Sequence, residues 1–281
     1  MIKKPDWLRV PYFETQDSLY ITDLLKVLSL NTVCVEANCP NRMECFSNKT
    51  ATFMILGIYC TRNCSFCNVN YGSPQPVDED EPTRIAEAVK KLDLKYVVIT
   101  SVTRDDLFDG GASHFSKVIR TIHDLSPETS VEVLIPDLSD IKIIIDESPA
   151  VISHNIETVE SLYPDVRPEA DYDRSLQVLR SIKEYSSGIY SKSGLMLGLG
   201  ETHEEILKTF DDLIAAGCDF LTLGQYLSPS KKHYPVFEYI NPQDFEKYAD
   251  IAKSKGFLFV ASGPFVRSSY NAVNALSNNP V

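Results

Sequence analysis

The stretch ATFMILGIYCTRNCSFCNV, residues 51–69, decides the fold. Its first nine residues (51–59) are apolar and rich in residues that favour strands, which is typical of a strand buried on both faces. Three cysteines follow at once, Cys60, Cys64 and Cys67. The stretch therefore predicts a buried parallel strand whose carboxyl end carries a cysteine loop.

The rest of the chain repeats this alternation of strand and helix. Strands are predicted at 95–101, 130–136, 150–155, 191–200 and 219–225, with a last extended run at 257–262. Helices are predicted at 81–93, 112–125, 140–148, 172–185, 203–216 and 243–255. Thr202 and Glu205 form a capping box, and Asn241 with Pro242 opens a helix that Gly256 ends.

Such a series builds a parallel sheet with right-handed crossovers. It permits a doubly wound sheet or an open barrel. We favour an α/β fold of the partial (β/α)6 TIM type, with N-terminal and C-terminal extensions covering the open end. The expected parts are an irregular N-terminal extension with a cysteine triad (1–50), the barrel (51–262) and a C-terminal segment (263–281).

Charge and composition limit the partners. The net charge is −12 and 43% of the residues are hydrophobic, so a large core is expected and a nucleic-acid partner is not. The chain shows neither a signal peptide nor a stretch that could span a bilayer. We expect a cytoplasmic protein without membrane attachment, and a monomer, since no coiled coil is apparent.

Polar residues gather directly after the predicted strands. They are Cys60–Cys67, Ser101–Asp106, Pro136–Asp137, His154–Glu157, Gly198–Glu201 and Gly224–Gln225. In parallel barrels the loops that follow the strands share one face, and that face holds the active site. Loops are polar in any protein, but that explanation predicts neither cysteines nor paired acids at equivalent points.

The triad Cys60, Cys64 and Cys67 has the spacing C-x3-C-x2-C. Three thiolates can hold three irons of a [4Fe–4S] cluster and leave the fourth iron open. A zinc site is the alternative, but it usually shows paired C-x2-C ligands and a fourth ligand nearby. The spacing resembles the radical S-adenosylmethionine (SAM) superfamily, in which the open iron chelates SAM and an electron cleaves it to a 5′-deoxyadenosyl radical.

A second triad, Cys34, Cys39 and Cys45, has the spacing C-x4-C-x5-C. Taken alone it fits zinc almost as well as iron. Beside the first triad it favours a second [4Fe–4S] cluster, with Glu36, Glu44 or a distant residue as fourth ligand. A cluster close to a carbon radical can supply sulfur, so we expect it to serve as a substrate.

The chain resembles the lipoyl synthase family from KPDWLRV near the start to VRSSYNA near the end. Shared stretches include VCVEANCPN, ITSVTRDDLFDGGASHF, SKSGLMLGLGET and LTLGQYLSPSKKHYPV. The second triad and RSSY are the most specific of them, and they distinguish the family from biotin synthase.

The resemblance implies insertion of sulfur at C6 and C8 of an octanoyl group, which an amide attaches to a lysine of a lipoyl carrier domain. Such carriers are the acyltransferase subunits of 2-oxoacid dehydrogenases and the H protein of glycine cleavage. Two SAM molecules are consumed, and the auxiliary cluster donates both sulfurs. Cys34, Cys39 and Cys45 would hold that cluster, with Ser269 of RSSY as fourth ligand. Reduced ferredoxin or flavodoxin and cluster-assembly proteins are the other partners.

Six residues are expected to bind SAM. Gly198, Gly200 and Glu201 resemble the superfamily's glycine-rich stretch near the adenine, where glycine permits close approach. Asn155 and Glu157 are candidates for the ribose hydroxyls and Arg167 for the carboxylate. A charged, solvated loop is the alternative for these last three.

Other residues carry weaker expectations. Cys218 is expected to pack in the core, and the five histidines lack ligand spacing. Arg104, Asp105 and Asp106 are expected to form salt bridges or to orient the cofactor. The loop Lys231–His233 faces either an acidic carrier or solvent. The chain departs from the family at Phe46, Ile152, Ser153 and Asn271.

Two other functions fit part of the sequence. A different sulfur-inserting radical enzyme, like biotin synthase, would not need the second triad or RSSY. A non-catalytic iron–sulfur or zinc carrier would not need polar residues in the loops after all of these strands.

Overall fold

The computed structural model describes residues 3–9, 13–48, 51–138, 140–270 and 272–278. The chain divides into two compact units. The first unit consists of Val10–Arg62 and Asn68–Ile152. The second consists of Met1–Arg9, Asn63–Cys67 and Ser153–Val281. Among the described helices, none is long and apolar enough to cross a membrane.

The strands of the first unit run in the order β1-β2-β5-β6. They are β1 (Asn31–Thr32), β2 (Thr52–Ile55), β5 (Tyr96–Ser101) and β6 (Ser130–Leu134). β2, β5 and β6 are parallel, whereas β1 is antiparallel to β2. All four residues of β2 are buried, as expected for a strand covered on both faces.

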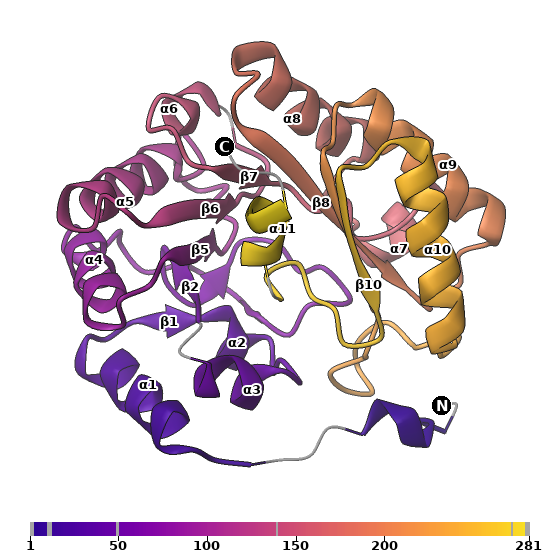
Figure 1. The fold of residues 1–281 in the computed structure, drawn as a ribbon, viewed down its shortest axis with the longest axis horizontal. Helices are drawn as coiled ribbons and strands as arrows, with labels where there is room; N and C mark the ends of the chain where they lie inside the picture. The colour runs from indigo at the N-terminus through magenta and orange to yellow at the C-terminus, as the bar shows by residue number, and fades with distance from the viewer. Residues whose placement is uncertain (1–2, 10–12, 49–50, 139, 271, 279–281) are drawn as a thin grey trace. The chain divides into compact units, whose positions relative to one another are not determined.

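Two long helices of the first unit lie side by side along these strands (Figure 1). They are α4 (Glu81–Lys91) and α5 (Ala112–Leu125), and the short α6 (Lys142–Ile145) packs against α5. Their inner faces bury Ile85, Val89, Val118 and Ile122. This is the apolar spacing of an amphipathic helix, and it predicted both long helices correctly.

The N-terminal extension is helical, so the prediction of irregular structure was wrong. It contains α1 (Gln16–Val27), α2 (Val33–Glu36) and α3 (Arg42–Ser47), and α1 packs against α3. In α1, Ile21, Leu24 and Leu25 are buried, but Leu19, Tyr20 and Val27 are about half exposed or more. With apolar residues on both faces, the sequence shows no clear helical stripe.

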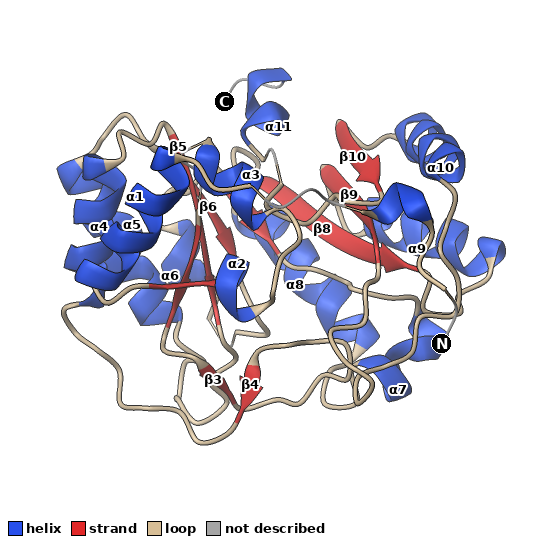
Figure 2. Cartoon of the chain, turned by 90° about the horizontal axis from the view of Figure 1, so that it is seen from below, coloured by secondary structure: helices blue, strands red, loops and turns tan. Residues whose placement is uncertain are grey.

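The predicted strand 51–59 ends early, at Ile55. Leu56 and Gly57 have positive φ angles of 67° and 95°, which no strand continues through. Two short parallel strands then flank the cysteine loop, β3 (Tyr59–Cys60) and β4 (Asn70–Tyr71). Figure 2 shows this pair set apart from β5 and β6.

The strands of the second unit run in the order β8-β9-β10 and are parallel. They are β8 (Tyr190–Leu197), β9 (Phe220–Gln225) and β10 (Phe259–Gly263). Strand β7 (Val151–Ser153) spans the boundary between the two units. The unit's helical elements are η1 (Asp6–Leu8), η2 (Glu160–Leu162), α7 (Tyr163–Val166), α8 (Tyr172–Tyr185), α9 (His203–Ala215), α10 (Pro242–Lys255) and α11 (Val273–Asn278).

Local capping signals set the ends of these helices as predicted. Thr202 and Glu205 form the capping box of α9. Asn241 caps α10 through its side chain, and Gly256 ends that helix at a φ of 115°. The succession of strands and helices confirms the α/β fold class of the partial-barrel type.

Candidate active site

Cys60 accepts two backbone hydrogen bonds at its sulfur. The N–H of Thr103 lies 3.3 Å from Sγ and that of Arg62 lies 3.4 Å from it. Thr103 follows β5, so the loop after one strand supports a ligand supplied by the loop after another. N–H donors stabilise a thiolate, and they tune the potential of a cluster bound to it.

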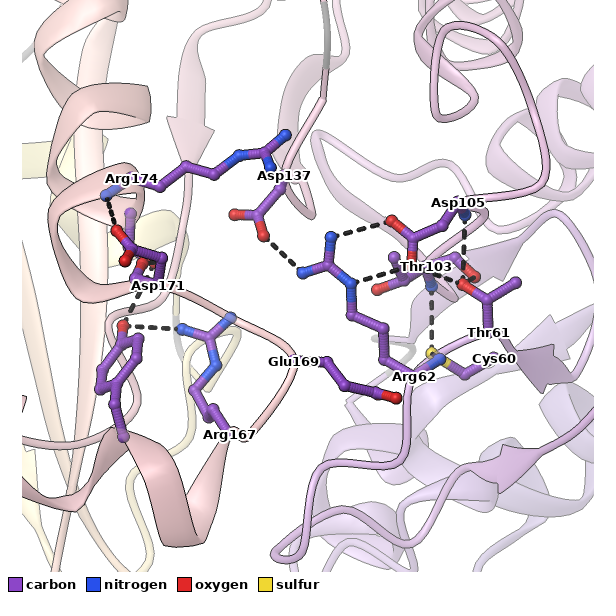
Figure 3. Close-up of polar contacts among 12 residues, drawn as sticks. Cys60, Thr61, Arg62, Thr103, Asp105, Asp137, Arg167, Glu169, Asp171 and Arg174 are labelled. Carbon is purple, nitrogen blue, oxygen red and sulfur yellow. Dashed lines mark hydrogen bonds and ion pairs between the residues drawn. The ribbon is translucent and has the colours of Figure 1, made fainter.

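The Arg62 side chain forms ion pairs with two aspartates (Figure 3). Its Nε and Nη2 donate to the two oxygens of Asp105 over 2.9 and 2.8 Å, and Nη1 contacts Asp137. Burial opposes the charge, but the two carboxylates outweigh it and raise the pKa of Arg62. Asp105 also accepts a hydrogen bond from Thr61 over 2.9 Å, so the start of the cysteine loop is fixed on both sides.

The remaining cysteines of this loop, Cys64 and Cys67, belong to the second unit. The N–H of Cys67 donates to the carbonyl of Cys64 over 3.1 Å, which closes a tight turn. Between them, Phe66 packs against the buried cluster of Val166, Leu199 and Tyr226. The three thiols thus sit on a loop that backbone contacts hold at both ends.

The second triad lies on α2, α3 and the turn between them. The N–H of Cys39 donates to the carbonyl of Cys34 over 3.1 Å. Burial raises the pKa of the Cys45 thiol to about 12, and the nearby thiols of Cys34 and Cys39 add to this shift. The thiols of Cys34 and Cys39 are thus close enough to that of Cys45 to oppose its ionisation, and bound iron would relieve that repulsion.

Among the described residues, no three His, Cys, Asp or Glu side chains are placed to hold a single metal ion. A [4Fe–4S] cluster presents a separate iron to each cysteine. Its ligands therefore do not have to converge on one point. The second triad offers three sulfur ligands that lie close together, and this suits such a cluster.

Ser269 lies in the second unit on a turn closed by the N–H of Tyr270, which donates to the carbonyl of Arg267 over 2.9 Å. The Arg267 guanidinium donates to the Val266 carbonyl over 2.7 Å. Ser269 therefore lies in a tight turn formed by the residues on either side of it.

Asn155, Glu157 and Arg167 lie together in the second unit. Asn155 Nδ2 donates to Glu157 Oε1 over 3.1 Å. Arg167 Nη1 donates to the Asn155 carbonyl over 3.1 Å and to the Tyr163 hydroxyl over 2.9 Å. Burial raises the pKa of Glu157, although Arg167 and Asn155 oppose the shift. The three residues predicted to bind SAM from this unit's loops are therefore in contact with one another.

Asn155 carries a buried acceptor atom that is not satisfied. The buried Oδ1 of Asn155 accepts no hydrogen bond from the described residues. A Cβ at Gly194 would stand 2.9 Å from that atom and from Thr222 Oγ1. Gly194 is therefore required by its close packing against Asn155 and Thr222, while the unsatisfied Oδ1 of Asn155 suits a donor such as a hydroxyl of SAM.

The glycine-rich turn after β8 packs closely against other parts of the second unit. A Cβ at Gly198 would lie 2.3 Å from the Glu238 carbonyl and 2.4 Å from Gln225 Nε2. The carboxylate of Glu201 accepts the N–H of Gly198 over 2.6 Å and that of Leu199 over 2.8 Å. Gly200 lies against the ring of Phe237. The glycine at 198 is therefore required by the chain's own packing, and Glu201 shapes the turn.

The weaker expectations are largely confirmed. Arg104 pairs with Asp106, and Cys218 is buried. Of the histidines, His114 is buried against Glu81 and His203 contacts Tyr248. Lys231 and Lys232 are exposed. Of the departures from the family, Phe46 is core, Ile152 and Ser153 are buried in β7, and Asn271 lies outside the described residues.

Sequence reasoning missed two functional contacts. It noted Asp137 only as a polar residue after a strand, and it did not pair Arg62 with it. It also assigned His233 to a surface loop, whereas His233 Nε2 lies 3.1 Å from the carbonyl of Cys67. The residues of the two contacts are 75 and 166 positions apart in the sequence. A local sequence pattern cannot predict a contact between residues so far apart.

The fold is shared with solved structures that are distant in sequence. The chain matches methylornithine synthase at a TM-score of 0.55 and 13% identity, over 89% of this chain and 82% of that one. It matches Streptococcus suis SuiB bound to S-adenosylmethionine at 0.59 and 14%, over 94% and 63%.

The sequence profile of the Radical SAM superfamily matches residues 54–213, so the chain is a member of that class of enzymes. It is 59% identical to the lipoyl synthase of Caldicellulosiruptor saccharolyticus, over 96% of both chains. It is 54% identical to that of Alkaliphilus metalliredigens, over 99% of this chain and 97% of the other. The chain belongs to the lipoyl synthase family.

Proposed function

We propose that the chain inserts two sulfur atoms, at C6 and C8 of an octanoyl group attached to a lysine of a lipoyl carrier domain. The observation that carries the proposal is the second group of thiols. Cys34, Cys39 and Cys45 lie close enough for the first two to raise the pKa of the third. A radical SAM enzyme that only generates a radical needs no such group.

We assign Cys60, Cys64 and Cys67 to the cluster that binds SAM. When bound, this cluster and SAM supply the one-electron chemistry that unactivated C–H bonds require, since no general base removes such hydrogens. Cys60 receives two N–H donors. The Arg62 ion pairs hold the loop that carries it. These contacts fix the ligands and so aim the reacting carbon.

We assign Cys34, Cys39, Cys45 and Ser269 to a second [4Fe–4S] cluster, which is the sulfur substrate and is consumed. A serine oxygen is a hard, weak ligand for iron, so it can release as sulfur is removed.

We assign SAM contacts to two places in the second unit. Asn155 offers a buried, unsatisfied Oδ1 to a ribose hydroxyl. Glu157 lies within hydrogen-bond reach of Asn155, and Arg167 is the candidate for the carboxylate. The turn Gly198–Glu201 lies beside the adenine in this proposal, with Glu201 keeping its backbone in place.

The remaining parts of the proposal concern organisation and partners. Residues 1–50 carry the auxiliary cluster, 51–262 form the radical SAM barrel, and 263–281 deliver Ser269. The substrates are octanoylated carrier domains, the electron donor is a ferredoxin or flavodoxin, and assembly proteins rebuild the auxiliary cluster. The protein works as a cytoplasmic monomer.

Anaerobic reconstitution tests this function. The chain is loaded with iron and sulfide, and its iron is counted, with about eight expected per chain. Dithionite, SAM and an octanoylated lysine peptide are added. Mass spectrometry should detect 5′-deoxyadenosine and a peptide with two additional sulfur atoms. Iron near four per chain, or deoxyadenosine without any sulfur gain, would contradict the proposal.

A further inference from the structure

His233 uses both ring nitrogens. Its Nε2 lies 3.1 Å from the carbonyl oxygen of Cys67, and its Nδ1 lies 2.8 Å from Ser230 Oγ. A carbonyl only accepts hydrogen bonds, so Nε2 carries the proton. Ser230 and Cys67 therefore fix both the position and the orientation of the imidazole.

A second contact links the same two segments. The N–H of Tyr234 donates to the carbonyl of Ser65 over 2.8 Å. The Tyr226 hydroxyl donates to the carbonyl of Tyr234 over 2.7 Å. Tyr234 and Phe66 pack against the same buried cluster. We call Tyr226–Tyr234 the brace, because it holds Ser65 and Cys67 from one side.

Within the brace, residues 230–233 form a turn in which some side chains are exposed and one is partly buried. The N–H of His233 donates to the Ser230 carbonyl over 3.2 Å. Lys231 and Lys232, within that turn, are exposed, whereas His233 is partly buried. The histidine therefore does not share the environment of the two lysines, and a purely solvated basic loop does not describe it.

We propose that His233 is a positioning residue for the radical cluster, which holds Cys67 through its backbone carbonyl. The inference rests on the proposed function in one respect, that Cys67 is a cluster ligand. A hydrogen bond to the carbonyl of a cluster ligand restrains the peptide plane next to its Cα and so limits how far its side chain can shift. Loss of the imidazole removes one hydrogen bond from that carbonyl and lets the loop move more, so the cluster is released more easily.

Three variants test this role: His233→Ala, His233→Gln and Ser230→Ala. The amide nitrogen of glutamine can replace Nε2 as donor to the Cys67 carbonyl. Lys232→Ala, on the exposed side of the same turn, is the matched control. Two quantities are measured, deuterium uptake of residues 63–67 in the cluster-free chain and the rate at which a chelator removes iron from the reconstituted protein.

We expect His233→Ala to increase deuterium uptake in residues 63–67 and to accelerate iron loss at least threefold. His233→Gln should restore most of both, Ser230→Ala should cause a smaller change in the same direction, and Lys232→Ala should match the wild type. Unchanged uptake and iron loss in His233→Ala overturn the inference, as does a Gln variant no better than Ala. Both measurements are independent of sulfur insertion, so failure of the proposed reaction would not be mistaken for failure of this role.

Discussion

The backbone N–H of Thr103 donates a hydrogen bond to Sγ of Cys60 over 3.3 Å. Thr103 follows β5, and its carbonyl in turn accepts hydrogen bonds from the N–H and the hydroxyl of Thr61, both over 3.1 Å. The two loops are therefore joined at the first cluster ligand. A hydrogen bond to a ligand sulfur raises the reduction potential of a cluster by stabilising the added electron.

Replacing Arg62 by methionine should strongly destabilise the chain. The Asp137 side chain is 1% exposed, and it would lose its ion pair with Arg62. Removing one member of a buried ion pair costs about 3–5 kcal/mol, because the other charge stays uncompensated. Urea unfolding of the cluster-free chain measures the effect.

The matched control for that prediction is Arg120→Met. Arg120 also pairs with a carboxylate, that of Glu147, but its side chain is 63% exposed. Exposed pairs contribute about 0–1 kcal/mol. Equal losses in the two variants would show that the Arg62 ion pairs do not stabilise the cysteine loop.

Local signals were predictable from the sequence, and long-range ones were not. The Thr202 capping box and the Gly256 helix end depend on a few neighbouring residues, and both were placed correctly. The early end of β2 depends on Leu56 in a left-handed conformation. That geometry is rare for leucine, so no propensity indicates it.

In the candidate site, too, some features were predictable from the sequence and others were not. Spacing predicted both cysteine triads, and their place after a predicted strand made Asn155 and Glu157 candidates for binding SAM. The contact of His233 with Cys67 depends on how the brace folds back 166 residues later. Only the three-dimensional structure shows such a contact, since neither residue has a distinctive neighbour in the sequence.

Two cysteine variants should separate the two clusters. Cys64→Ala removes a ligand of the radical cluster, so deoxyadenosine formation should fall below detection. Cys39→Ala removes a ligand of the auxiliary cluster, so SAM cleavage should continue while sulfur insertion is lost. Chromatography of deoxyadenosine and mass spectrometry of the peptide measure the two activities. If both variants cleaved SAM equally well, this division of roles would be wrong.

Gly194→Ala should weaken SAM binding about tenfold or more, since a loss of 1.4 kcal/mol is already a factor of ten. The added Cβ would stand 2.9 Å from Asn155 Oδ1 and Thr222 Oγ1, so the Asn155 side chain would have to move from the position in which it offers its acceptor to SAM. Anaerobic equilibrium dialysis with the reconstituted protein measures the affinity. Gly188→Ala is the control, because its nearest neighbour would be 4.0 Å away. Equal affinity in both variants would place SAM elsewhere.

Glu205 should make stability depend on pH in the acid range. The Ser161 hydroxyl and the N–H and hydroxyl of Thr202 donate to its carboxylate, and these bonds lower its pKa below the ordinary 4.5. Because the folded-state pKa is the lower one, the stabilisation is complete above pH 4.5 and is lost as pH falls through the folded-state value.

Glu205→Gln should therefore reduce the free energy of unfolding at neutral pH, and the difference from wild type should shrink below pH 4.5. Urea unfolding at several pH values measures it, with Glu204→Gln on the same helical turn as control. A difference that stayed constant to pH 3 would mean that the ionised carboxylate is not what stabilises the start of α9.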